Sequence, residues 1–176
     1  FTLFTFSCFA QNIGTNIGDI APDIKMLNPQ GDSINLYSLR GKVVLVDFWA
    51  SWCGPCKKET PNKINAYNTY KDKNFSIGNG FTIFGISLDR NKDSWLNYIE
   101  TNEMNWYHVS NVSHWNCPAA KSYGIRGIPS NLIIDKDGFV VAKNLRGEKL
   151  INTLENYIVK DPKEELNQQI ISLKAY

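Results

Sequence analysis

The chain of 176 residues has the length of one ordinary α/β domain with short extensions at its ends. Hydrophobic residues make up 43% of it and charged residues 20%, so a packed core is possible and global disorder is excluded. Acids and bases are interspersed, and the formal net charge of +2 is too small to predict binding to nucleic acid or to a polyanionic surface.

An uncharged apolar run, Phe1–Phe9, begins the sequence and is too short to span a bilayer. It fits the end of a signal-peptide apolar region, with the small residues Cys8 and Ala10 in an Ala-x-Ala-like cleavage site before Gln11. Two alternatives remain open: a lipid-modified membrane anchor at Cys8, and a buried first strand. We expect export from the cytoplasm, with residues 1–18 as a signal remnant and polar connector.

The organised domain is predicted to span residues 19–160. Ile24–Leu27 and Ser33–Leu36 flank a turn that contains Pro and Gly, which predicts a hairpin. The unbroken apolar run Lys42–Trp49 predicts a strand buried on both faces at the centre of a sheet. A helix should follow this strand and continue to about Tyr70. Its expected apolar stripe consists of Ile64, Tyr67 and Tyr70.

The second half of the chain alternates between strand and helix patterns. After a polar loop at residues 71–80, the predicted elements are a core strand at Phe81–Leu88, a helix at Asp93–Thr101, a short strand at Trp106–Val109, a short helix at Pro118–Tyr123, hairpin strands at Ser130–Ile134 and Phe139–Lys143, and a helix from Gly147 with Leu150, Ile151, Leu154 and Ile158 on its apolar face. This order predicts an α/β fold with a central mixed sheet flanked by helices. Residues 161–176 should form a C-terminal helical extension.

The chemistry is predicted to reside in Cys53-Gly54-Pro55-Cys56, at the junction of the core strand and the following helix. Thiol–disulfide exchange needs one thiolate that attacks and a second thiol that resolves the mixed disulfide. At a helix N-terminus the unpaired N–H groups stabilise the first thiolate, and the second cysteine lies deeper. We therefore assign attack to Cys53 and resolution to Cys56.

Two other uses of the cysteine pair are weaker. A structural bridge that closes so small a loop would remove little entropy from the unfolded chain. A zinc site would need ligands from Cys117, His108 and His114, whose spacing matches no finger or ribbon. We expect no metal, a buried Cys117 that acts as a small hydrophobe, and loop positions for both histidines.

Two stretches resemble the thioredoxin family. Trp49–Lys57 (Trp-Ala-Ser-Trp-Cys-Gly-Pro-Cys-Lys) is similar to its active-site signature, and Gly124–Pro129 (Gly-Ile-Arg-Gly-Ile-Pro) is similar to its cis-proline loop. They occur in the family's order, and the resemblance covers about residues 19–160. The N-terminal hairpin and the segment around residues 89–116 resemble the exported TlpA/ResA-like branch. The resemblance implies a thioredoxin-like fold.

The resemblance also implies roles for individual residues. Asp47 matches a buried acid beneath the resolving cysteine, where it would accept the proton of Cys56; a paired structural carboxylate is the alternative. Pro129 matches the cis-proline that faces the disulfide. Trp49 is expected in the core. The residues expected to border the substrate groove are Trp52, Gly54, Pro55, Ile128 and Pro129.

The expected function is reduction of protein disulfides outside the cytoplasm, with no cofactor other than the redox-active Cys53–Cys56 disulfide. The expected partners are disulfide-containing proteins and a membrane-bound thiol donor, and the chain should be a monomer with a possible N-terminal membrane tether. Oxidase or isomerase activity is the alternative, because exported compartments are oxidising. Peroxidase activity is disfavoured, because Ala50 stands where the peroxidase relatives carry Thr. A binding module without the chemistry is disfavoured as well, because both thiols of the motif are intact. ResA-like reductases carry an acid between their cysteines; Gly54-Pro55 here disfavours their haem-site specificity.

Overall fold

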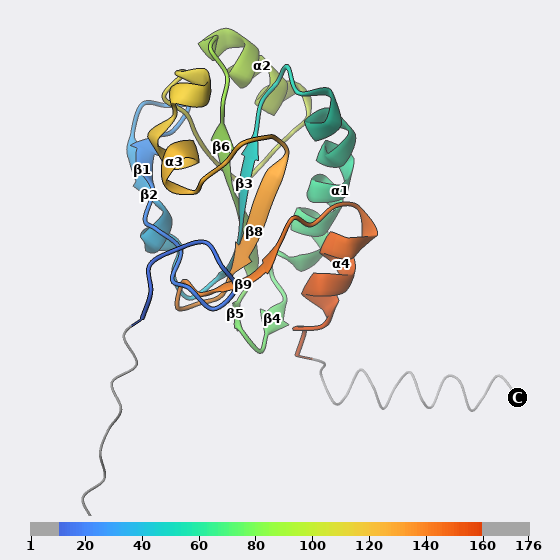
Figure 1. Ribbon diagram of the computed structural model, residues 1–176. Helices are drawn as coiled ribbons and strands as arrows, with labels where there is room; N and C mark the ends of the chain where they lie inside the picture. Colours follow the sequence, from blue (N-terminus) through green and yellow to red (C-terminus); the bar gives the residue numbers. More distant parts are fainter. Residues whose placement is uncertain (1–10, 160–176) are drawn as a thin grey trace, which may run out of the picture.

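The computed structural model of the chain describes residues 11–159 and is built around a five-stranded mixed sheet (Figure 1). β3 is the middle strand; it pairs in parallel with β6 and antiparallel with β8. This arrangement confirms the predicted α/β fold and the central position of the apolar run. The strands in spatial order are β7 (Tyr107–Val109), β6 (Phe81–Ser87), β3 (Val43–Trp49), β8 (Ser130–Ile134) and β9 (Val140–Lys143).

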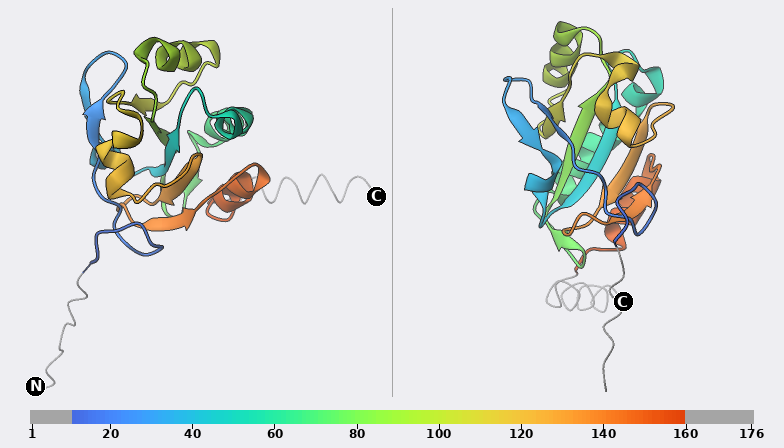
Figure 2. Two further views of the ribbon diagram at one scale, coloured as in Figure 1. Left: turned by 45° about the horizontal axis from the view of Figure 1, so that its top comes forward. Right: turned by 60° about the vertical axis from the view of Figure 1, so that its left-hand side comes forward.

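Helices and a small hairpin cover the two faces of this sheet (Figure 2). α1 (Gly54–Tyr70) and α4 (Glu148–Glu155) lie side by side on one face, and α3 (Pro118–Ser122) lies with the hairpin of β1 (Lys25–Leu27) and β2 (Ser33–Asn35) on the other. The predicted hairpin is thereby confirmed. The remaining helices are α2 (Lys92–Thr101) and two short 3-10 helices, η1 (Leu36–Leu39) and η2 (His114–Asn116).

All seven residues of β3 are buried, because its side chains contribute alternately to cores on both faces. Val43 and Leu45 pack with Leu150 and Leu154 of α4, whereas Val44 and Phe48 belong to the core that includes the hairpin. Packing on both faces explains why this strand lacks the polar alternation of a half-exposed strand. It also means that Asp47, in the same strand, must find a partner inside the protein.

Three predicted details are wrong. The expected polar loop contains a small antiparallel pair, β4 (Asn74–Phe75) and β5 (Gly78–Asn79), which forms because the Phe75 ring is buried against the core. α4 ends at Glu155, so Ile158 lies beyond the helix, where it bridges Phe75. The buried stripe of α1 agrees with the prediction only at Tyr70, because the helix face that covers the disulfide and the sheet is a different one. It consists of Cys56, Thr60, Lys63, Ala66 and Tyr70, with Ile64 and Tyr67 half-buried.

The ends of the predicted domain are only partly covered by the described residues. Residues 11–18 lie against β9, where the Gly18 N–H donates to the Val140 carbonyl at 2.9 Å. The predicted signal remnant at Phe1–Phe9 and the predicted terminal helix after residue 160 fall outside the described residues. Within residues 11–159, no helix has the length and apolar character needed to cross a membrane.

Candidate active site

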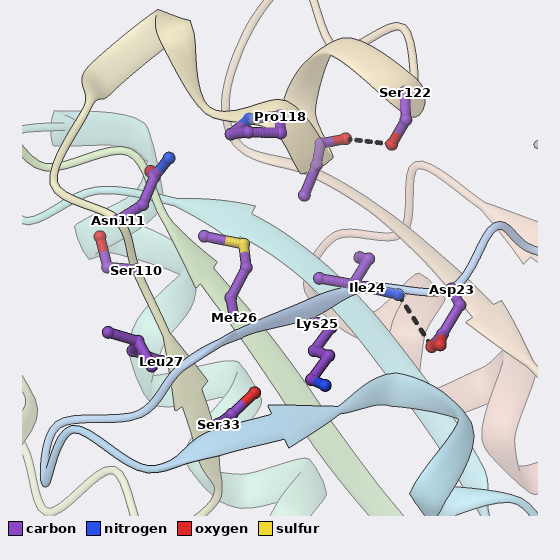
Figure 3. A pocket seen from close by; sticks show the side chains of 11 residues that line it. Asp23, Ile24, Lys25, Met26, Leu27, Ser33, Ser110, Asn111, Pro118 and Ser122 are labelled. Carbon is purple, nitrogen blue, oxygen red and sulfur yellow. Dashed lines mark hydrogen bonds between the residues drawn. The ribbon is translucent and has the colours of Figure 1, made fainter.

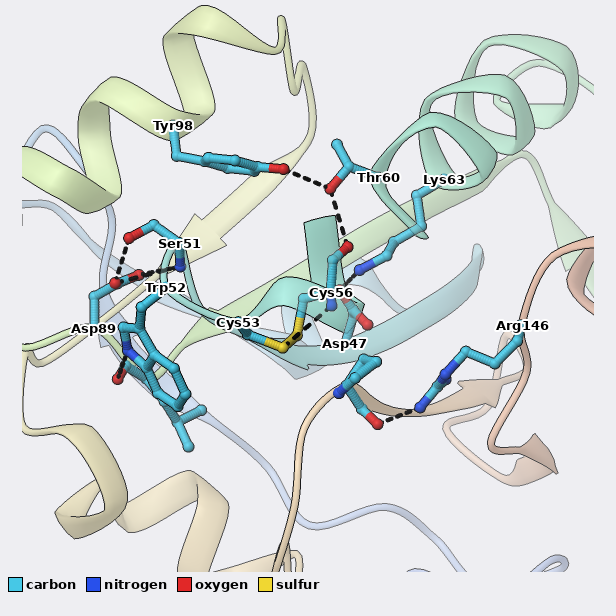
Figure 4. The surroundings of a disulfide bond; sticks show 12 residues. Asp47, Ser51, Trp52, Cys53, Cys56, Thr60, Lys63, Asp89, Tyr98 and Arg146 are labelled. Carbon is cyan, nitrogen blue, oxygen red and sulfur yellow. Dashed lines mark hydrogen bonds and ion pairs between the residues drawn. A yellow bond between two sulfur atoms is a disulfide. The ribbon is translucent and has the colours of Figure 1, made fainter. Parts of the chain in front are cut away.

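The two cysteines of the motif form a disulfide where β3 passes into α1 (Figure 4). Cys53 is the N-cap of α1, and its Sγ accepts the backbone N–H of Cys56 at 3.1 Å. Both cysteines are buried, while Gly54 and Pro55 between them are exposed. Pro55 fits the first helical turn because no intrahelical acceptor is available there for an N–H. A thiolate at Cys53 would therefore face helical N–H groups, the environment that favours its charge.

The loop before β8 carries the cis peptide bond that the resemblance implies, between Ile128 and Pro129. Ile128 is half-buried and packs against the core that contains both cysteines. The guanidinium of Arg146 donates to the carbonyl of Pro129 and, at 2.7 Å, to that of Leu145. Sequence reasoning did not identify Arg146, because nothing local indicates that the start of α4 lies beside this loop (Figure 4).

Trp52 forms the exposed rim of the site, with 48% of its surface accessible. Its indole N–H donates to the Leu88 carbonyl at 3.3 Å, and its ring lies 5.0 Å from that of His114. The loop position predicted for His114 is wrong, since this residue begins η2. An exposed aromatic ring that is fixed at both its polar and apolar sides is suited to contact a substrate.

Asp47 and Lys63 form a buried ion pair beneath the disulfide. Only 2% of Asp47 is exposed, and its Oδ2 accepts a hydrogen bond from the ammonium of Lys63. In the sheet register Asp47 lies beside Gly85 of β6, where a Cβ would stand 3.1 Å from Nδ1 of His108 and 3.1 Å from Nε1 of Trp49, so these two rings occupy the space that the missing side chain leaves. The carboxylate is therefore paired, as the structural alternative expected, and it also lies in the strand that leads to the cysteines.

Lys63 was missed in the sequence because isolated lysines on helices usually lie in solvent. Its spacing was the available signal: it follows Cys56 by seven residues, about two helical turns, and therefore shares its face of α1. A lysine on the buried face of a helix next to an acid in a buried strand indicates an internal pair.

His108 is also buried, on β7 beside Gly85, so the loop position predicted for it is wrong. Its Nε2 lies 3.0 Å from the Met104 carbonyl, to which it donates, and its Nδ1 has no protein partner among the described residues. Burial lowers the pKa of His108 from 6.5 to about 4; the Met104 carbonyl opposes this effect and the charge of Lys63 adds to it. The imidazole is therefore neutral at physiological pH.

A pocket of about 280 Å³ adjoins this centre, with Trp52, Asp89 and His114 among its lining residues, whereas another pocket and the third described cysteine lie apart from it. A pocket of about 620 Å³ lies between β1 and α3, with Ile24, Met26 and Pro118 among its lining residues and no residue of the predicted site (Figure 3). Cys117 is a free thiol and fully buried, in agreement with the prediction. Within residues 11–159, no group of His, Cys, Asp and Glu side chains is arranged to hold a metal ion.

Known proteins resemble the chain in both sequence and fold. The model of the thioredoxin-like family matches residues 41–140. The thiol–disulfide oxidoreductase ResA of Bacillus anthracis is 31% identical over 160 residues, which cover 91% of this chain and 86% of the relative. The thioredoxin domain of a thiol–disulfide oxidoreductase from Bacteroides vulgatus is 40% identical, with 80% and 96% of the two chains covered and a TM-score of 0.72. A thiol:disulfide interchange protein from Bacteroides sp. is 36% identical, with 88% and 95% covered and a TM-score of 0.71.

Replacement of Lys63 by Met should destabilise the protein strongly. The change leaves the Asp47 carboxylate buried without its partner, which typically costs about 3–5 kcal/mol in the free energy of unfolding. Asp47→Asn in the same background should recover part of this loss. Lys58→Met, on the exposed side of the same helix, should change stability by less than about 0.5 kcal/mol. Urea unfolding of the four proteins tests the pair, and equal stability of the two single lysine variants would contradict it.

His108 should make the protein less stable in acid. Between its ordinary pKa of 6.5 and its folded value of about 4, the unfolded chain binds a proton that the folded chain does not. Stability is therefore fully present above pH 6.5 and falls as the pH approaches 4, by up to about 3 kcal/mol. His108→Asn should flatten this part of the stability–pH curve; His114→Asn, at a much less buried ring whose pKa is also lowered by desolvation and by Arg90, should flatten it less. Parallel curves for both variants would contradict the assignment.

Proposed function

The chain belongs to the thioredoxin-like family of thiol–disulfide oxidoreductases, and from this premise we propose that it reduces protein disulfides outside the cytoplasm through the Cys53–Cys56 dithiol. The observation that carries the proposal is the placement of Cys53 as the N-cap of α1, with the N–H of Cys56 directed at its sulfur. This environment stabilises a nucleophilic thiolate. Trp52, Ile128 and Pro129 lie on the segments that would border the bound substrate.

The proposed reaction has two steps. The Cys53 thiolate attacks one sulfur of the substrate disulfide, forms a mixed disulfide and releases the other substrate sulfur as a thiolate. Cys56, as a thiolate, then attacks Cys53 Sγ, which forms the Cys53–Cys56 disulfide and releases the second substrate thiolate. Two electrons pass to the substrate. We assign the proton of the Cys56 thiol to Asp47, which lies buried beneath it with one carboxylate oxygen bonded to Lys63.

The surroundings of Cys53 favour reduction over oxidation. Gly54 and Pro55 supply no charge between the cysteines, and the Lys57 ammonium lies over the Tyr98 ring, 5.5 Å from its centroid. The helix N-terminus is then the main source of thiolate stabilisation, and a modest stabilisation keeps the disulfide from being strongly oxidising. Oxidase or isomerase activity is the second candidate, because an exported compartment would be oxidising.

We further propose the setting of this activity. The apolar run Phe1–Phe9 and the small residues Cys8 and Ala10 support export, with a membrane tether through Cys8 as the variant of that proposal. A reductase in an oxidising compartment needs continual re-reduction, so a membrane-bound thiol protein is the proposed donor. The substrates are disulfide-containing proteins, and the chain acts as a monomer.

The roles of the two cysteines can be separated by trapping. Cys56→Ser removes the resolving thiol, so the mixed disulfide formed by Cys53 should accumulate with a disulfide-containing model substrate such as scrambled ribonuclease. Cys53→Ser should trap none, because Cys56 lies within α1 with 1% of its surface exposed, whereas Cys53 is the N-cap and is 4% exposed. Non-reducing gel electrophoresis and mass spectrometry measure the adducts. Adducts on Cys56 instead of Cys53 would reverse the assignment.

The reduction potential tests the direction of the reaction. We expect a reduction potential nearer to the thioredoxin value of about −270 mV than to the value of about −120 mV of a dedicated oxidase. The dithiol form should reduce insulin in the presence of dithiothreitol. Equilibration with glutathione buffers gives the potential. A value above about −180 mV, in the isomerase range, would reject the reductase proposal while leaving the cysteine roles intact.

A further inference from the structure

A second buried carboxylate, that of Asp89, lies beside the segment that leads to Cys53 (Figure 4). Asp89 follows β6 and only 1% of it is exposed. Its carboxylate accepts hydrogen bonds from the Ser51 backbone N–H at 3.0 Å, from the Ser51 hydroxyl at 2.7 Å and from the Ser87 hydroxyl at 2.7 Å. The Ser87 hydroxyl in turn accepts the backbone N–H of Asp89 at 3.0 Å, which directs its proton to the carboxylate.

The end of β6 thereby holds the whole connection between β3 and α1. The Leu88 N–H donates to the Trp49 carbonyl at 2.8 Å, and the Leu88 carbonyl accepts the indole N–H of Trp52 at 3.3 Å. Together with the hydrogen bonds from Ser51 to Asp89, these contacts fix Trp49, Ser51 and Trp52 against the residues that follow β6. Cys53 is the next residue, so its position at the helix start depends on these contacts.

The charge of Asp89 has no ionic partner among the described residues. Its hydrogen-bond donors are a neutral amide and two neutral hydroxyls, the arrangement of an ionised acceptor. The neighbouring Arg90 is directed to His114, with its guanidinium nitrogen 3.4 Å from Nδ1 of that ring. Lys57, on the other side of the helix start, lies over Tyr98. The carboxylate therefore lies near the N-terminus of α1 with no ion pair within residues 11–159, and Arg90 lines the same pocket.

We propose that Asp89 is a positioning residue of the disulfide centre, which fixes the segment before Cys53 and whose negative charge disfavours the Cys53 thiolate. The inference rests on the proposed function and deepens it. A negative charge near the helix start offsets part of the stabilisation that the helical N–H groups give a thiolate. Stabilisation of the thiolate favours the dithiol form. A weaker stabilisation therefore makes the dithiol a stronger reductant. Asp89 would thus help to keep the centre on the reducing side.

Two substitutions separate the charge from the hydrogen bonds. Asp89→Asn keeps an acceptor for the Ser51 N–H but removes the charge, and Asp89→Ala removes both. The matched control is Asp93→Asn, which removes an exposed carboxylate from the first turn of α2 without touching this network. The measurements are the pH titration of the Cys53 thiolate by ultraviolet absorbance, the equilibrium with glutathione, and urea unfolding of the oxidised proteins.

Asp89→Asn should lower the pKa of the Cys53 thiol and shift the glutathione equilibrium toward the dithiol by about threefold or more. Asp89→Ala should give the same shift and also slow the attack on protein disulfides, because the Ser51–Trp52 segment is released. Asp93→Asn should leave the thiolate titration and the equilibrium as in the wild type.

Wild-type titration and equilibrium in Asp89→Asn would overturn the proposal, even if Asp89→Ala is less stable, because Asp89 would then be structural only. A shift as large in Asp93→Asn would also overturn it, since any nearby charge would suffice. The thiolate titration needs no substrate. Failure of the wild-type protein to reduce insulin would therefore reject the proposed function. It would leave the comparison of the thiolate titrations, which tests the role of Asp89, unchanged.

Discussion

The placement of a carboxylate in the middle strand of a sheet covered on both faces constrains the rest of the structure. An unpaired charge at Asp47 would be very costly there, and the partner comes from α1. For Lys63 to reach the carboxylate, α1 must lie with one particular face on the sheet. The same face carries Cys56 two turns earlier and places Cys53 at the helix start. The ion pair and the disulfide are thus two results of one helix orientation.

The site is held by contacts between elements that are distant in the sequence. Asp89 and Leu88 hold the connection before Cys53, and Arg146 holds the carbonyl of Pro129. Glu59 of α1 accepts the N–H of Gly147 at 2.8 Å and so joins α1 to the start of α4. The first three of these contacts hold Ser51, Trp52 and Pro129, which belong to or adjoin the proposed site, and the fourth fixes the helix that begins at the disulfide. A thiol exchange centre needs such support, because attack on a disulfide requires sulfur atoms held in a defined geometry.

The sequence predicted the elements whose signals are local. The β3 strand, the start of α1 and the hairpin at residues 24–36 follow from apolar runs and turn residues, and the cis bond before Pro129 followed from the resemblance. What could not be predicted depends on neighbours across the sheet. The pattern predicts the short strand at Trp106–Val109 but not the burial of His108, which depends on the neighbouring strand at Gly85 and on the Met104 carbonyl. Lys63 reads as a surface residue until the phase of α1 is known. Phe75 is buried because residue 158 returns to pair with it.

Asp47 and Asp89 show how two buried carboxylates near one disulfide can differ in character. Asp47 is paired with the ammonium group of Lys63, so the two charges largely cancel outside the pair. Asp89 is solvated by neutral dipoles, which stabilise its charge locally but leave its field at longer range. In the proposed reaction Asp47 accepts the proton of Cys56, and its carboxylate is held in place by the ammonium of Lys63. Asp89 is held by three hydrogen bonds from Ser51 and Ser87, and in the role that we propose it acts on Cys53 through its position and its charge. Two acids in one small region can thus serve the two cysteines in different ways.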